Sequence, residues 1–312
     1  MHAVFGVHLF FYVEDVVDTF LRQVVNGLSL GSIYALIALG YTMVYGIVKL
    51  INFAHGDVMM VGAYAGYFVL RAMGATPVGL FCAFVAAMVI CSLLSLVIER
   101  CAYRPLRNAP RLNSLITAIA VELILQNLMR VLPFVGPAPR QFPTMPTKMF
   151  SIGLITISNI QIIVIISSAV LMLVLNYIIN YTKIGKAMRA VSYDMGAASL
   201  MGISVNSTIA ITFVIGSILA GAGGVLYATA YPQISPTMGY IPGLKAFVAA
   251  VLGGIGSVPG AMVGGVILGI AETMTKAYLS SQYADAISYS ILIVMLLVKP
   301  AGLLGKKHVV KV

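Results

Sequence analysis

The sequence predicts an all-α polytopic membrane protein. Hydrophobic residues make up 60% of its 312 residues and charged residues only 9%, whereas about one-quarter of the residues in soluble domains are charged. The charges are also clustered, and each gap between clusters can supply the ~20 residues of a helix that crosses a bilayer. The charge-free runs are 23–48, 72–98, 149–182, 195–244 and 246–271. The strands of about ten alternating residues that build membrane barrels do not occur.

We therefore expect one transmembrane domain over residues 1–312, with about eight transmembrane helices and additional broken or re-entrant segments. Charges, prolines and glycines bound the individual spans. The clearest spans are 23–48, 78–98, 112–132, 160–180, 207–230 and 283–298. A long Pro-rich connection at 133–158 lies outside them.

Two segments fit a single straight span poorly. The charge-free run 58–70 is only about 20 Å long as a helix. Residues 51–70 are therefore either a span that includes the polar residues Asn52, His55 and Asp57 or a broken helix. Within 243–275 the sequence GGIGSVPG is a strong turn signal, which predicts a pair of helices rather than one.

Arginines and lysines gather in the loop at 100–111, in the segment at 183–189 and at the C-terminus. Because short basic loops stay on the cytoplasmic side of a membrane, we expect all three on that side. Membrane topology thus accounts for the net charge of +10, and no motif supports nucleic-acid binding.

No arrangement of residues typical of catalysis or metal binding is present in the sequence. The four histidines are scattered, and the three cysteines lack disulfide or metal-ligand spacing. Neither a GxSxG elbow nor a GxxxxGK[ST] nucleotide loop occurs. We expect no catalytic residue, no metal site and no cofactor bound by this chain.

A charged island lies at 183–203 between two apolar spans. Within it the spacing of three and four residues predicts a single apolar helix face, formed by Met188, Val191, Met195, Ala198 and Gly202. Small and flexible residues suit docking of a soluble protein better than anchoring in lipid headgroups, which favours Trp, Phe or Leu. A connecting helix that lies at the headgroups is the alternative.

Polar residues near the second apolar segment form another group of candidates. Asn52, His55 and Asp57 lie either in a solvated cytoplasmic turn or in a broken helix that lines a gate. A proton relay through His55 and Asp57, as in a secondary transporter, is a further alternative.

Two more polar sets recur at four-residue spacing within apolar spans. Glu122, Gln126 and Arg130 share one helix face, and Glu272 is followed by Lys276. We expect both sets to be structural, because such pairs hydrogen-bond along a helix. A substrate site is the alternative for the first set.

Four segments resemble a known family. RAVSYDMGAASLMGI (189–203) resembles the cytoplasmic coupling loop of ABC importer permeases. NGLSLGSIYALIALGYTMVYGIVKLINFAHGD (26–57), AFVAAVLGGIGSVPGAMVGGVILGIAET (246–273) and KPAGLLG (299–305) resemble the LivH-type permease subunits of high-affinity branched-chain amino acid importers. The resemblance covers most of the chain and is least diagnostic over 131–180.

The resemblance implies a permease subunit of an ATP-driven importer that carries leucine, isoleucine and valine across the bacterial inner membrane. The implied partners are a second homologous permease subunit, two cytoplasmic ATPase subunits that use the ATP, an extracytoplasmic amino-acid-binding protein and membrane lipid. A permease for urea, short amides or other amino acids is the closest alternative. An ion-driven secondary transporter and a channel or membrane scaffold are the others.

Candidate site residues follow from these readings. Those for coupling to the ATPase, within 183–203, are Arg189, Asp194, Ala197, Ala198 and Gly202. Those for the translocation path are Ser32, Tyr34, Asn52, His55 and Asp57.

Overall fold

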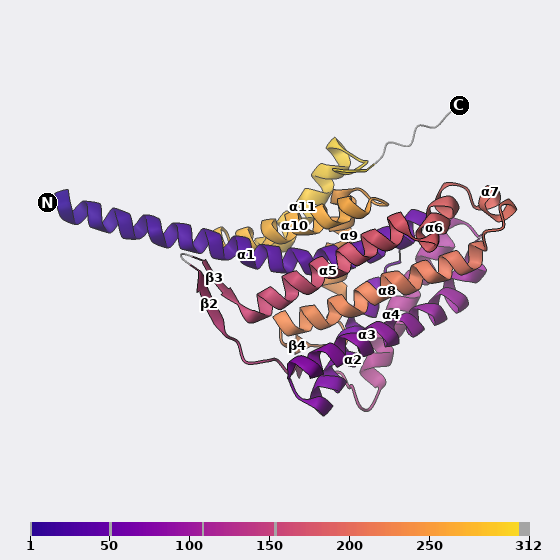
Figure 1. Cartoon of the computed structure of the whole chain (residues 1–312), viewed down its shortest axis with the longest axis horizontal. Helices are drawn as coiled ribbons and strands as arrows, with labels where there is room; N and C mark the ends of the chain where they lie inside the picture. Colours follow the sequence, from indigo (N-terminus) through magenta and orange to yellow (C-terminus); the bar gives the residue numbers. More distant parts are fainter. Residues whose placement is uncertain (1, 50–51, 108, 153–154, 306–312) are drawn as a thin grey trace.

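The computed structural model describes residues 2–49, 52–107, 109–152 and 155–305. Its helices follow the charge-free runs of the sequence (Figure 1). They are α1 (His2–Val48), α2 (His55–Met73), α3 (Pro77–Ile98), α4 (Arg111–Val131), α5 (Asn159–Tyr181), α6 (Lys183–Tyr193), α7 (Met195–Leu200), α8 (Val205–Ala230), α9 (Tyr240–Gly253), α10 (Val258–Tyr278) and α11 (Tyr283–Val298). A π-helical turn η1 (Glu99–Tyr103) and a 3-10 turn η2 (Arg104–Leu106) extend α3.

The all-α membrane fold is confirmed. Six helices in the described ranges are long and apolar enough to cross a membrane, and α9 and α11 are shorter apolar helices. This agrees with the expected number of about eight. The first span differs from its predicted bounds, because α1 is continuous from His2 to Val48.

The predicted helix pair at 243–275 is also confirmed, as α9 and α10. Gly254 and Gly256 in the turn between them have φ angles of +106° and +94°. Residues with a Cβ rarely adopt such angles, so these two glycines let the chain reverse direction. The first turn of α10 is capped by Ser257, whose hydroxyl accepts from the Gly260 N–H at 3.2 Å.

Helix α1 lies at the centre of the bundle, packed along α10, α8, α9 and α5. Figure 1 shows α2, α3 and α8 side by side below it and α9, α10 and α11 above. Helix α4 is peripheral and packs mainly against α2 and η1. The outer faces of α3, α4, α5 and α11 expose large apolar side chains, as expected of surfaces that contact lipid.

The loops collect at the two ends of the bundle. The η1–η2 segment, α6–α7 and the turn between α9 and α10 lie at one end, which we call the basic end (Figure 1). At this end Arg107 connects η1 to the start of α8, because its guanidinium donates to Glu99 and to Asn206. The predicted grouping of the two internal basic segments on one side is therefore confirmed.

The opposite end carries short strands that the sequence did not predict. Within the Pro-rich connection, β2 (Met149–Ile152) and β3 (Ile155–Ser158) pair antiparallel, and β1 (Arg140–Gln141) pairs with β4 (Gln233–Ile234). Figure 1 shows the β2–β3 hairpin beside the N-terminal half of α1. The α5 helix begins directly after it with a capping box between Ser158 and Gln161.

Small residues let α1 and α10 approach closely. A Cβ atom on Gly265 would lie 2.5 Å from the Ala35 Cα, and one on Gly269 would lie 2.3 Å from the Gly31 Cα. Since apolar surface gains nothing by leaving lipid for protein, such close backbone packing holds membrane helices together.

We expect Gly265→Ala to separate α1 from α10 and to cost about 1–3 kcal/mol of folding free energy, because the new methyl group meets backbone atoms that cannot move aside. Gly46→Ala on α1 is the matched control, since its new Cβ would have no neighbour closer than 3.7 Å. Thermal unfolding in detergent should show a lowered midpoint for Gly265→Ala alone. Equal midpoints for the two variants would contradict the role of this contact.

Candidate functional site

The chain turns back between α1 and α2, and this turn buries polar groups. Asn52, His55 and Asp57 are only 5%, 1% and 1% exposed. The Tyr103 hydroxyl donates to the Asn52 Oδ1 at 2.8 Å. The His55 ring packs edge-on against Tyr41, with 4.9 Å between the centroids. The interpretation of these residues as a solvated turn is therefore wrong. The broken helix is wrong as well, because α2 is continuous from His55 to Met73 and includes both His55 and Asp57.

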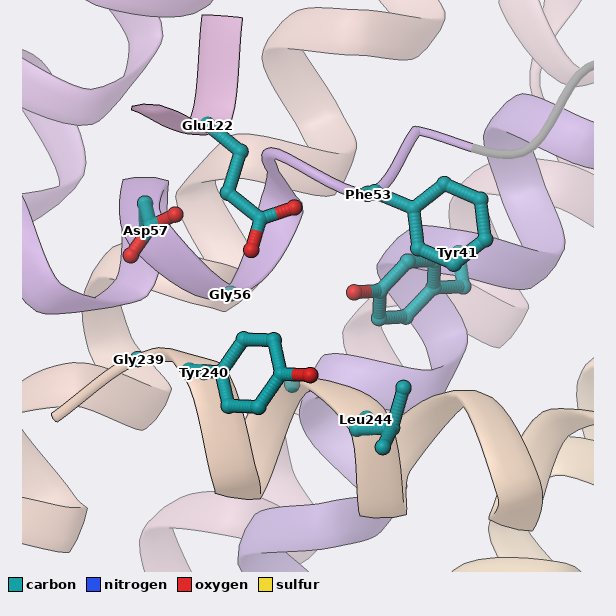
Figure 2. Close-up of a pocket in the computed structure, with 9 residues that line it drawn as sticks. Tyr41, Phe53, Gly56, Asp57, Glu122, Gly239, Tyr240 and Leu244 are labelled. Carbon is teal, nitrogen blue, oxygen red and sulfur yellow. The ribbon is translucent and has the colours of Figure 1, made fainter. Parts of the chain in front are cut away.

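The first turn of α2 meets the first turn of α9. A Cβ atom on Gly56 would lie 2.4 Å from the Gly239 carbonyl oxygen, so only glycine fits where the two helices begin. Beside this contact lies a small, partly open cavity with room for about one water molecule. Figure 2 shows the residues that line it: Tyr41, Phe53, Gly56, Asp57, Glu122, Gly239, Tyr240, Gly243 and Leu244.

Two carboxylates face this cavity from different helices. Asp57 lies in the first turn of α2 and Glu122 near the midpoint of α4 (Figure 2). The Gln126 side-chain amide bridges them, donating to Asp57 at 3.2 Å and to Glu122 at 3.5 Å. The predicted pairing of Glu122 with Gln126 is confirmed, whereas Arg130 bonds to Asn127 instead. Neither carboxylate has an ion-pair partner among the described residues.

The segment 183–203 is two helices, and the prediction of one continuous apolar stripe is wrong. Asp194 has extended backbone angles, ends α6 and caps α7 by accepting from the Ala197 N–H at 2.9 Å. Met188 and Val191 are buried, whereas Met195 is 38% exposed. The predicted stop at Gly202 is confirmed, because its φ of +80° ends the helical region after α7.

Most of the residues predicted to couple to the ATPase instead make contacts within this chain. Arg189 donates to the Ile179 carbonyl, and Asp194 caps α7, so both hold their own chain in place. Ala198 is only 4% exposed, which contradicts the idea that it offers a thin outer face to a partner. Ala197 is exposed.

Large apolar side chains that the sequence analysis did not single out point outward at the basic end. Tyr193, Leu200 and Met201 are 95%, 89% and 82% exposed. We call these three residues the apolar tip. Their exposure at a loop, away from the apolar flanks of the bundle, is typical of a protein contact.

Residues 23–296 match the family described as the permease component of the branched-chain amino acid transport system. The chain belongs to this family. It is 46% identical to the high-affinity branched-chain amino acid transport system permease protein LivH of Escherichia coli K12, over 94% of this chain and 98% of that protein. It is 43% identical to BraD of Pseudomonas aeruginosa with the same coverage. A probable LivH of Methanocaldococcus jannaschii is 30% identical over 88% of this chain and 89% of that protein.

The resemblance drawn from the sequence is thereby confirmed, and so is the assignment of the chain as a transport permease. Together with the apolar helices, family membership also confirms the predicted location in the inner membrane. The comparisons do not identify individual residues of the translocation path or of the contact with the ATPase, so those assignments stay predictions.

Four of the five predicted path residues of the permease, including Ser32 and Tyr34, do not line the cavity. The Ser32 hydroxyl donates to the Leu28 carbonyl at 2.7 Å within α1. The Tyr34 hydroxyl donates to Glu272 at 2.9 Å. Both side chains are at most 4% exposed, so they belong to the packed interior. Of the five predicted path residues only Asp57 lines the cavity. Tyr41, Tyr240 and Glu122, which was expected to be structural, line it as well.

The permease also contains a buried charge cluster that the sequence revealed only in part. The predicted pair of Glu272 and Lys276 is present at 2.6 Å. Lys245 from α9 joins it, 2.8 Å from Glu272 and 2.7 Å from Asp285 on α11. The cluster links α1, α9, α10 and α11, and thereby fixes the helix whose first turn borders the cavity.

Proposed function

We propose that this chain is the permease subunit through which an ATP-driven importer moves leucine, isoleucine and valine across the inner membrane. The observation that carries this proposal is 46% identity, over nearly the full length of both chains, to a protein named as a branched-chain amino acid permease. Two further relatives with the same kind of name support it.

The cavity supports a transport role. Transporters build their passages at the starts of interrupted helices, because backbone and polar groups there can face cargo inside an otherwise apolar bundle. In this chain α2 and α9 both begin beside the cavity, and its polar groups include two carboxylates and a tyrosine hydroxyl. In the closed form described here a water molecule fits, whereas a whole amino acid requires the walls to separate.

The apolar tip supports coupling to a cytoplasmic ATPase. The sequence contains no nucleotide-binding loop, so ATP would be bound and hydrolysed by partner subunits, and this chain would need no cofactor. The basic end would face the cytoplasm. A rigid ATPase contact there would move α6 and α7, which lie between the long helices α5 and α8.

The remaining partners are those that the resemblance to ABC importer permeases implies. A second homologous permease subunit would cover the open side of the cavity, two ATPase subunits would occupy the basic ends of the permease pair, and a soluble binding protein would dock at the opposite end. Lipid would cover the apolar outer helices.

Uptake by cells that express the complete transport operon tests this function. We expect ATP-dependent, saturable uptake of labelled leucine, reduced by excess isoleucine or valine, and copurification of an ATPase with this subunit. Labelled urea and acetamide are the control cargoes, and cells without this subunit give the background. Uptake of urea but not of leucine would favour the related permeases for small amides.

A further inference from the structure

The two carboxylates that line the cavity have no positively charged partner among the described residues. Asp57 is 1% exposed, and the only side chain that donates to it in the described ranges is the neutral amide of Gln126. Glu122 faces the same cavity from the middle of a helix that can cross a membrane. A carboxylate at that depth costs roughly 2.5–3.5 kcal/mol unless a cation or donors offset its charge.

The structure supplies part of that offset, but no positive charge. The first turn of α2 stabilises the Asp57 carboxylate through the helix dipole, by about 0.3–1 kcal/mol. Glu122, near the midpoint of α4, is far from the ends of its own helix. Lys245, the one buried lysine or arginine among the described residues, is held by Glu272 and Asp285 instead.

A hydrogen-bond donor faces the cavity from the opposite wall. Tyr41 is 5% exposed, and its hydroxyl points into the cavity across from Asp57 (Figure 2). In the described part of the chain this O–H donates to no side chain. Phe53 and Leu244 supply apolar wall on the same side of the cavity as Tyr41 (Figure 2).

We propose that this cavity recognises the zwitterionic end of the transported amino acid, with the α-ammonium group between Asp57 and Glu122 and the α-carboxylate at the Tyr41 hydroxyl. The inference rests on the proposed function. It states that the permease itself recognises the α-ammonium and α-carboxylate groups of the cargo. The two negatively charged carboxylates can accept hydrogen bonds from the three N–H donors of an ammonium group. The Tyr41 O–H can donate to a carboxylate oxygen.

Helix α4 gives the cargo a way in. It carries Glu122 but packs mainly against α2 and η1, so an outward shift of this one peripheral helix widens the cavity. Arrival of the ammonium group would then draw Glu122 back toward Asp57. Recognition and closure would use the same two carboxylates.

Protection of an introduced cysteine from alkylation tests the proposal. The background lacks the native cysteines at 82, 91 and 101, and Leu244→Cys places the reactive thiol on the cavity wall. The complete permease–ATPase complex is placed in lipid nanodiscs without binding protein. The alkylation rate is measured with leucine, with 3-methylbutylamine, which lacks the carboxylate, and with 4-methylpentanoate, which lacks the ammonium.

We expect leucine to slow alkylation by about tenfold, 3-methylbutylamine by about threefold, and 4-methylpentanoate by less than about twofold. In Asp57→Asn/Glu122→Gln, protection by leucine and by the amine should disappear. Asp18→Asn is the matched control, because it neutralises a half-buried carboxylate paired with Arg22, far from the cavity, and should keep full protection.

Three results would overturn the proposal: protection by 4-methylpentanoate equal to that by leucine, protection that survives in the doubly neutral variant, or sodium or potassium chloride protecting as well as the amine. The last would make the cavity an inorganic cation site. Leucine uptake by the unmodified complex, reconstituted with its binding protein, distinguishes failure of this inference from failure of the proposed function. Uptake without ammonium-dependent protection removes only this inference, whereas absence of leucine uptake removes the proposed function.

Discussion

Replacing Leu200 and Met201 together by aspartate is expected to lower ATP-driven amino acid uptake by at least about 30-fold, equivalent to about 2 kcal/mol of docking free energy. Both side chains are almost fully exposed at the basic end, so the change does not disturb the core of the chain. In an apolar contact with an ATPase subunit, however, each aspartate would lose its hydration without gaining a partner. Uptake of labelled leucine and copurification of the ATPase measure the effect.

The matched control is the exchange Leu200→Met/Met201→Leu, which keeps size and hydrophobicity and should keep uptake. Asp194→Ala gives a different expectation, because it removes the N-cap of α7 and leaves the apolar tip in place. We expect it to weaken uptake less, through about 1 kcal/mol of helix stability. Unchanged ATPase binding in the double aspartate variant would show that the contact surface lies elsewhere.

Most of the helices could be predicted because the bilayer imposes a length on them. Runs without charge between 78 and 98 or between 207 and 230 leave few alternatives to a spanning helix, and α3 and α8 cover those residues. The break after Gly253 was also visible, since glycines at 254 and 256 adopt backbone angles that other residues avoid.

The break inside 183–203 was missed because periodicity was given more weight than capping. Met188, Val191, Met195 and Ala198 follow helical spacing, but Asp194 within that run is a strong N-cap residue. Its extended backbone ends α6 and starts α7; Ala198 is buried, whereas Met195 is 38% exposed. An aspartate in the middle of an apolar stripe was the signal that could have located the break.

The cavity could be predicted only in part because it depends on contacts between distant segments. Asp57 stood out as a charge near an apolar run, but nothing local indicates that Gly56 packs on Gly239 or that Glu122 reaches the same space. Lys245 likewise appeared as a single charge in a long apolar stretch. Its partners lie 27 and 40 residues further along the chain, on two other helices.

The buried charge cluster leads to the second large effect, which we expect from Glu272→Met. Glu272 is 1% exposed and accepts from Lys245 at 2.8 Å, from Lys276 at 2.6 Å and from Tyr34 at 2.9 Å. Without it Lys245 keeps only Asp285, which is half exposed, so one end of a buried ammonium group is left uncompensated. Breaking a buried pair in this way costs about 3–5 kcal/mol.

The double variant Lys245→Met/Glu272→Met decides whether charge or shape is responsible. It removes the buried ammonium along with the carboxylate, and the remaining Lys276 and Asp285 have side chains exposed enough to be solvated, at 41% and 53%. Because apolar replacement of a whole buried ion pair is often neutral, we expect the double variant to recover most of the lost stability, less about 1 kcal/mol for the Tyr34 hydroxyl. The sequence contains no tryptophan, so a thiol-reactive dye that reports exposure of the buried Cys91, in a background without Cys82 and Cys101, is the appropriate probe of thermal unfolding. If the double variant unfolds at the same temperature as Glu272→Met or below it, the cluster stabilises α9 through packing rather than through charge balance.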